Sequence, residues 1–224
     1  GRVFIGNNDR HLYALDAASG RQLWKFPTGG EVESTPALYR DLVIFGSFDG
    51  SVYGVEAATG KQRWVYRTGP RMPGIEGLKS VTRGVDSSPA VAGERVYFGA
   101  WDGKVHCLEA GTGRTVWTRQ LGSLIHWSAP AVAEGRLVIG STDGKLNCLR
   151  VDDGALAWSV PVAKAHLDAM MSGPAIDRGM VFVGGGYENG FYAFSLADGR
   201  QRWKFSARNL VCSTPAVDGE RVYG

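Results

Sequence analysis

The sequence lacks several features that would point directly to a class of function. No apolar run approaches the ~18–20 residues that a membrane-spanning helix needs, so we expect no such segment in this chain. The net charge is only +3, which is too small to indicate a nucleic-acid-binding protein. The three cysteines include no adjacent pair, and the four histidines show no metal-ligand spacing. These absences argue against a membrane helix, a nucleic-acid interface and a Cys/His metal site.

Glycine is the residue that the chain has in excess. There are 32 Gly against 9 Pro, and 11% of the residues are aromatic. This composition is typical of many short strands joined by tight turns. The chain opens at Gly1 without a methionine or a signal peptide, which says little about compartment if the natural N-terminus lies upstream.

Two short motifs each recur five times and alternate strictly along the chain. The first is Gly-x-x-x-Trp, at Gly20–Trp24, Gly60–Trp64, Gly113–Trp117, Gly154–Trp158 and Gly199–Trp203. The second is Ser-x-Pro-Ala, at Ser34–Ala37, Ser87–Ala90, Ser128–Ala131, Ser172–Ala175 and Ser213–Ala216. Chance would not interleave two such motifs in order, so the chain is a tandem repeat.

The spacing of the two motifs separates a rigid part of the repeat from a variable part. From each Pro to the next Trp the distances are 28, 28, 28 and 29 residues, whereas from each Trp to the next Pro they are 12, 25, 13, 16 and 12. Insertions into a packed unit displace core side chains, but a surface connection tolerates them. We therefore expect Pro-to-Trp to be the structural unit and Trp-to-Pro to contain the adjustable loop.

Inside each unit, apolar residues alternate with a period of two. Arg95–Gly99 and Lys104–Leu108 flank Asp102-Gly103, a pattern that predicts a hairpin with a type I′ turn and positive φ at both central residues. Each repeat then reads as four strands, A to D, with the Ser-x-Pro-Ala proline in strand A, at an inner edge of the sheet. The expected repeats cover approximately residues 1–31, 32–84, 85–125, 126–169 and 170–210, and 211–224 starts a further one.

The repeat predicts an all-β propeller of four-stranded antiparallel blades, in a single partial domain over residues 1–224. A plain β-sandwich is the alternative, but its strands would not recur with one motif for every four strands. The exposed sheet edges of such a chain would favour association with other chains.

The repeat resembles the PQQ-type propeller repeat of the quinoprotein alcohol dehydrogenase-like superfamily. The residues that carry the resemblance are Ser87–Val91, Arg95–Gly99, Asp102–Val105 and Gly113–Trp117. The resemblance implies rings of seven or eight blades, so two or three would lie outside this chain. It also implies that the repeated tryptophans dock between neighbouring blades, which here are Trp24, Trp64, Trp117, Trp158 and Trp203.

The resemblance is specific for fold but not for function. The family includes quinoprotein dehydrogenases, the lipoprotein of the bacterial outer-membrane β-barrel assembly machinery (BamB), and sensor domains attached to kinases. Fold alone does not choose among these activities. The resemblance implies a periplasmic or otherwise extracytoplasmic setting in bacteria.

The residues argue against catalysis. The dehydrogenases of this family hold PQQ on a tryptophan floor, beside calcium and under a disulfide between adjacent cysteines, and this chain has no such pair. Cys107 and Cys148 instead share one repeat position with Ala14, Gly54 and Ala193, which favours a small buried side chain over a disulfide. We predict no catalytic residue, no metal and no cofactor, and PQQ with calcium belongs only to the dehydrogenase alternative.

A candidate pocket lies where the D–A loop enters the inner strand. The residue before each repeated Ser is Glu33, Asp86, Trp127, Met171 or Cys212, and the one before that is Val32, Val85, His126, Met170 or Val211. The residues that depart from the common pattern near the channel mouth are our candidate pocket: His126, Trp127, Asp168, Met171 and Cys212. The alternative is that Trp127 and the methionines only plug the channel.

The second candidate is the 25-residue connection from Trp64 to Pro89. It holds the cations Arg71, Lys79 and Arg83 ahead of Asp86, and these could contact an acidic peptide, a phosphate or a lipid head group; the alternative is a solvated loop. Because strand direction alternates, D–A and B–C loops share one face. We predict a non-catalytic scaffold that binds a protein or peptide on this face. The alternatives are a fragment of a PQQ- and calcium-dependent dehydrogenase and a sensor domain of a larger receptor or kinase.

Overall fold

The computed structural model describes residues 1–72, 84–165, 170, 172–186 and 188–224, and these residues form β-strands and connections without a helix. The strands are β1 (Arg2–Asn7), β2 (His11–Asp16), β3 (Gln22–Pro27), β4 (Ala37–Tyr39), β5 (Leu42–Gly46), β6 (Ser51–Glu56), β7 (Gln62–Arg67), β8 (Ala90–Ala92), β9 (Arg95–Gly99), β10 (Lys104–Glu109), β11 (Thr115–Gln120), β12 (Ala131–Ala133), β13 (Arg136–Gly140), β14 (Lys145–Arg150), β15 (Leu156–Pro161), β16 (Ala175–Asp177), β17 (Met180–Gly184), β18 (Gly190–Ser195), β19 (Gln201–Ser206), β20 (Ala216–Val217) and β21 (Val222–Tyr223). The described residues therefore include no candidate membrane-spanning helix.

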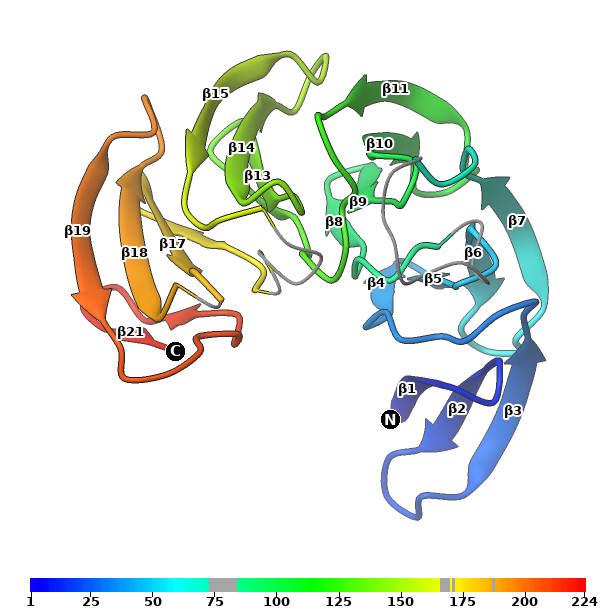
Figure 1. Cartoon of the computed structure of the whole chain (residues 1–224). Coiled ribbons are helices and arrows are strands. Elements are labelled where there is room, and N and C mark those ends of the chain that lie inside the picture. Colours follow the sequence, from blue (N-terminus) through cyan, green and yellow to red (C-terminus); the bar gives the residue numbers. More distant parts are fainter. Residues whose placement is uncertain (73–83, 166–169, 171, 187) are drawn as a thin grey trace.

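The strands form separate antiparallel sheets in chain order, which confirms the predicted propeller blades. Four sheets have four strands each (β4–β7, β8–β11, β12–β15 and β16–β19), β1–β3 form a three-stranded sheet, and β20 pairs with β21. The blades stand side by side in an open arc, with β3, β7, β11, β15 and β19 along its outer rim (Figure 1). The inner strands β4, β8, β12, β16 and β20 contact one another in sequence.

Repeated tryptophans join each blade to the next. Four of them donate a hydrogen bond from Nε1 to a backbone carbonyl of the following blade: Trp24 to Ala57 (3.2 Å), Trp64 to Ala110 (3.1 Å), Trp117 to Val151 (2.9 Å) and Trp158 to Leu196 (2.8 Å). The indole covers a turn glycine with positive φ; a Cβ on Gly199 would lie 2.8 Å from the ring of Trp158. Only glycine fits such a position without strain. Trp203, on the last complete blade, is 41% exposed.

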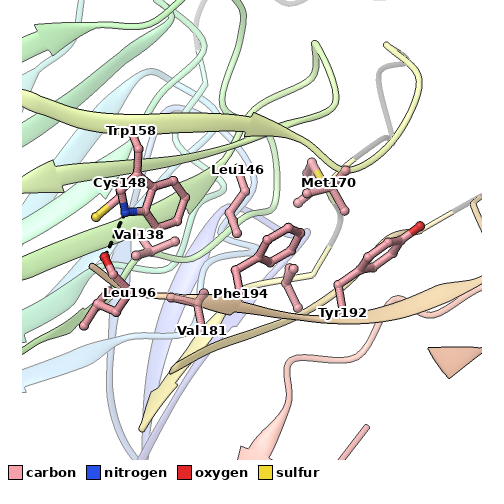
Figure 2. Packing of buried hydrophobic residues seen from close by; sticks show 11 residues of the cluster. Val138, Leu146, Cys148, Trp158, Met170, Val181, Tyr192, Phe194 and Leu196 are labelled. Carbon is pink, nitrogen blue, oxygen red and sulfur yellow. Dashed lines mark hydrogen bonds between the residues drawn. The ribbon is translucent and has the colours of Figure 1, made fainter. Parts of the chain in front are cut away.

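Apolar side chains fill the space between neighbouring blades. Figure 2 shows the cluster between β12–β15 and β16–β19, where Trp158 reaches Leu196 and lies beside Cys148. Cys148 pairs across the strands with Trp158, as Cys107 pairs with Trp117, and both cysteines are fully buried free thiols. The bulk of each indole explains why its partner position takes only Cys, Ala or Gly.

The repeated serines tie the inner strands together. In four of the five repeats the serine Oγ accepts a hydrogen bond from the last glycine N–H of strand B, at 2.8 Å for Ser34 and 2.9 Å for Ser128. Ser87 also donates to the carbonyl of Ser128 in the next blade, at 2.8 Å. The motif's proline was expected within strand A, but each A strand begins at the alanine after it. Proline lacks the N–H that a ladder requires, so pairing starts one residue later.

The Asp-Gly hairpins form, but their turn type differs from the prediction. Only the glycine has positive φ, at 81° for Gly50 and 75° for Gly103. Gly50 N–H donates to the carbonyl of Ser47 at 3.0 Å, which gives a type I turn followed by a left-handed glycine. Positive φ at both central residues occurs instead in the A–B hairpins, at Glu134-Gly135 and Arg178-Gly179.

Candidate functional site

The D–A loops and the B–C turns of the blades lie against one another on one face of the arc. Their backbones are hydrogen-bonded: Phe48 N to the carbonyl of Glu31 at 2.9 Å, and Trp101 N to that of Gly84 at 3.1 Å. Each of these bonds joins a B–C turn to the D–A loop that enters its own blade. The loops that vary in length are therefore held by fixed turns on this face.

Trp127 is an additional residue in its D–A loop. Val32 N and Val85 N each donate to the carbonyl of the residue that follows the last glycine of strand B. In the next blade Ile125 N makes this bond, to the carbonyl of Ala100 at 3.3 Å. A Cβ on Gly99 would meet Ile125, just as one on Gly46 would meet Val85. The predicted alignment, which placed His126 in the valine column, is therefore wrong by one residue. The distance from Trp117 to Pro130 is 13 residues, one more than the 12 in the shortest loops, as expected for one inserted residue.

The backbone at Trp127 adopts a conformation that is unfavourable for a bulky residue. Its φ is +57°, and Ser128 N–H donates to the carbonyl of His126 at 2.7 Å, closing a tight three-residue turn. Turns of this kind with positive φ are rare and strained, and such strain concentrates at functional sites. Ile125, before the turn, makes the core contacts. Trp127, within the turn, is 36% exposed at the surface.

Beneath Trp127, a buried histidine is held by residues of the preceding blade. Nδ1 of His126 pairs with Oδ2 of Asp86, and both side chains are buried. The other carboxylate oxygen, Oδ1, accepts a hydrogen bond from Nε1 of Trp101 at 3.2 Å. The ring of Trp101 also meets the imidazole edge-on, with centroids 5.3 Å apart and planes at 82°. His126 is thus fixed in position and orientation.

The oriented imidazole supports the exposed indole. Trp127 stacks on His126 with ring centroids 4.2 Å apart and planes at 21°. Its Nε1 donates to Oε2 of Glu33 at 3.4 Å, and Glu33 is exposed two blades back along the arc. We call this assembly of Glu33, Asp86, Trp101, His126 and Trp127 the Trp127 bracket. It spans the entrances of three successive blades.

The structure brings together some of the predicted site residues. Asp86, His126 and Trp127 are in contact, while Glu33 and Trp101 complete the bracket without having been predicted as site residues. Arg71 lies beside Met72, whose N–H donates to the carbonyl of Trp101 at 3.0 Å. Cys212 occupies the equivalent loop of the last blade, after Val211, which bridges to Gly186. The remaining predicted residues, Lys79, Arg83, Asp168 and Met171, lie outside the described residues.

A second buried histidine has a structural role. His106 Nε2 lies 3.2 Å from Oδ1 of Asp102, and its Nδ1 lies 3.1 Å from the hydroxyl of Tyr66. Burial raises the pKa of Asp102, but the hydrogen bond and charge of His106, with a bond from Gly69 N–H, outweigh it and leave the pKa below its usual value. In the preceding blade Tyr53 bonds Asp49 at 2.6 Å in the same way. These contacts hold the Asp-Gly turns in place.

The described residues offer no cluster of metal ligands, and two of the three cysteines are buried in the core. Within the described ranges, no group of three or more His, Cys, Asp or Glu side chains could hold a metal ion. Burial raises the pKa of Cys107 to about 11 and that of Cys148 to about 12, which suppresses their thiolate forms. Both oxygens of Asp86 are engaged by His126 and Trp101. What the bracket offers to a ligand is the indole of Trp127 and the carboxylate of Glu33.

Known proteins share the repeat and the fold. The family described as outer membrane protein assembly factor BamB matches residues 1–123, 71–170 and 142–224, which together span the chain. The crystal structure of BamB from Moraxella catarrhalis superposes with a TM-score of 0.79 at 21% identity, over 99% of this chain and 66% of that one. A 1-butanol dehydrogenase (quinone) of Thauera butanivorans is 49% identical over 39 residues, which is 17% of this chain and 6% of that protein. Because one family matches throughout, the chain belongs to the family described as outer membrane protein assembly factor BamB.

Proposed function

We propose that the chain is a non-catalytic propeller scaffold that binds a protein partner on its D–A/B–C loop face, through the Trp127 bracket. The observation that carries this proposal is the inserted, strained and exposed Trp127. A residue that serves the core would not need an extra position in the loop, and Ile125 already fills the core position. Partly exposed tryptophans held rigidly in place are frequent energetic centres of protein interfaces.

Family membership suggests the setting for this binding. The family is described by a role in outer membrane protein assembly, so we propose that the partner belongs to that process and that the chain works in an extracytoplasmic compartment. Arg71, next to the bracket, would add a charge-dependent contact with the partner. Lys79 and Arg83 are further basic residues of the same connection in the sequence.

The dehydrogenase alternative finds less support in the bracket. A calcium ion needs six to eight oxygen ligands, whereas the bracket holds two carboxylates, and both oxygens of Asp86 are engaged. The described residues of the bracket therefore provide too few oxygen ligands for calcium. The short match to a quinone-linked dehydrogenase has about the length of one repeat, and it supports the shared repeat.

Photo-crosslinking in cells tests the proposed function. The photoreactive residue p-benzoylphenylalanine replaces Trp127, and a matched chain carries it at Ala18, an exposed C–D turn residue at the opposite end of the blades. We expect position 127 to crosslink a defined protein of outer membrane assembly and position 18 to give none of it. Equal capture of the same proteins from both positions would reject the loop face as the binding surface.

A further inference from the structure

We infer that the Trp127 bracket binds an arginine side chain presented by the protein partner. The inference rests on the proposed function in one respect: it takes the loop face as the partner-binding surface. It adds the chemistry that this surface recognises, which follows from the two groups that the bracket leaves exposed.

The first exposed group is the indole of Trp127, which is 36% exposed. His126 stacks on one face of Trp127 with ring centroids 4.2 Å apart, and among the described residues no second ring stacks on this indole. A tryptophan face attracts a cation through the ring quadrupole more strongly than tyrosine or phenylalanine does. The stack on His126 and the tight turn at residue 127 hold the ring in place, so little side-chain entropy is lost on binding.

The second exposed group is the carboxylate of Glu33. Its Oε2 lies 3.4 Å from Nε1 of Trp127, so a negative charge sits at the edge of the indole. The described residues donate no hydrogen bond to the other oxygen, Oε1, which keeps its acceptor capacity. A cation over the ring would meet this carboxylate without leaving the stacked position.

Both groups together suit guanidinium better than ammonium. Guanidinium is planar, stacks on an aromatic ring and donates N–H groups in its own plane to a carboxylate beside that ring. Lysine presents a compact, strongly hydrated charge that gains less from stacking. Asp86 is not available to the ligand, because its two carboxylate oxygens are engaged by His126 and Trp101 inside the bracket.

Titration with short peptides, followed by proton–nitrogen correlation of the indole N–H groups, tests the inference. The probe is N-acetyl-glycyl-arginyl-glycine amide, its neutral control carries citrulline, and agmatine represents a free guanidinium compound. We expect the Trp127 signal to shift saturably with the arginine peptide and about tenfold more weakly with citrulline. The indole signal of Trp158, buried against Leu196, serves as an internal reference that does not move.

Two variants complete the test. Glu33→Gln should weaken arginine-peptide binding about fivefold, whereas Glu220→Gln, which removes the same charge in an exposed A–B turn at the other end, should not. Equal shifts with arginine and citrulline, the absence of a saturable shift, or tighter binding of agmatine than of the peptide would each overturn the inference. A partner crosslinked at position 127 together with any of these results would leave the proposed function standing and reject only the arginine.

Discussion

His126 and Asp86 form a buried pair that joins two successive blades at their entrances, with Nδ1 of the imidazole facing Oδ2 of the carboxylate. The same carboxylate accepts the indole N–H of Trp101. Removing it would leave two buried donors without a partner. We therefore expect Asp86→Ala to lower the free energy of unfolding by about 3 kcal/mol, measured by urea denaturation.

A matched control separates this effect from the general loss of a carboxylate. Asp152 has a side chain that is 91% exposed, and its contact to Arg95 is a loose 4.0 Å. Asp152→Ala should change stability by less than about 0.5 kcal/mol. If both variants unfold at the same urea concentration, the buried pair does not organise the bracket as described.

Deletion of Trp127 should restore the common loop length without harming the fold. The deleted chain loses a ring stack worth about 0.5–1.5 kcal/mol, but it also loses a strained backbone position that costs about 1–3 kcal/mol. We expect its stability in urea to equal or exceed that of the parent. Trp127→Ala, which keeps the extra residue and its strain, should be the less stable of the two. A loss of more than about 2 kcal/mol on deletion would show that Trp127 serves the core.

The tryptophan contacts between blades predict that the same substitution lowers stability much more at one position than at another. Trp158→Phe removes the donor to the Leu196 carbonyl, at 2.8 Å in a buried interface, and should cost about 1–3 kcal/mol. Trp203→Phe affects a residue that is 41% exposed and should cost less than about 0.5 kcal/mol. Thermal or urea unfolding of the two variants gives the comparison, and equal losses would contradict the blade-docking role of Trp158.

The buried cysteines predict a loss of stability in alkali. Burial raises the pKa of Cys107 to about 11 and that of Cys148 to about 12, from an ordinary value of 9.0. Between the unfolded and folded pKa values the unfolded thiols ionise while the folded ones stay protonated. The unfolded state then binds fewer protons, and stability falls as pH rises from about 9.

Replacing both cysteines by alanine isolates this contribution. Alanine already occupies the same repeat position at Ala14 and Ala193, both fully buried. In urea unfolding at about pH 8 and about pH 10, the parent should lose more stability than the double variant. Native Cys107 and Cys148 should also resist a thiol reagent until the chain unfolds. Fast labelling of either in the native chain would contradict the burial.

The fold could be predicted from the sequence because every blade repeats the same local signals. Periodicity, the Ser-x-Pro-Ala motif and the Trp spacing each recur five times, and the chain forms the four-stranded antiparallel sheets that they predict. Turn type was harder to predict, since Asp-Gly suits two hairpin geometries. The type I turn with a left-handed glycine lets Asp102 bond both His106 and Gly69 of the preceding blade's connection, a tertiary contact that the dipeptide does not encode.

The candidate site was only partly predictable. Comparing the repeats identified His126 and Trp127 as unusual. Counting back from Ser128, however, aligned His126 with Val32 and Val85, whereas the structure aligns Ile125 with them. The additional residue in the Trp117–Pro130 spacing was visible in the sequence, whereas its position was not. Glu33 and Trp101 were missed because their contacts connect three blades, and the relative placement of blades is not encoded in the pattern of one repeat.

The affinity of the crosslinked partner for the purified chain tests the central claim most directly. Biolayer interferometry would compare the parent chain with the Trp127 deletion and with Trp203→Phe. We expect the deletion to weaken binding at least about tenfold, because an anchoring tryptophan is lost, and Trp203→Phe to leave affinity unchanged. Unchanged affinity on deletion of Trp127 would contradict the assignment of the bracket as the partner-binding site.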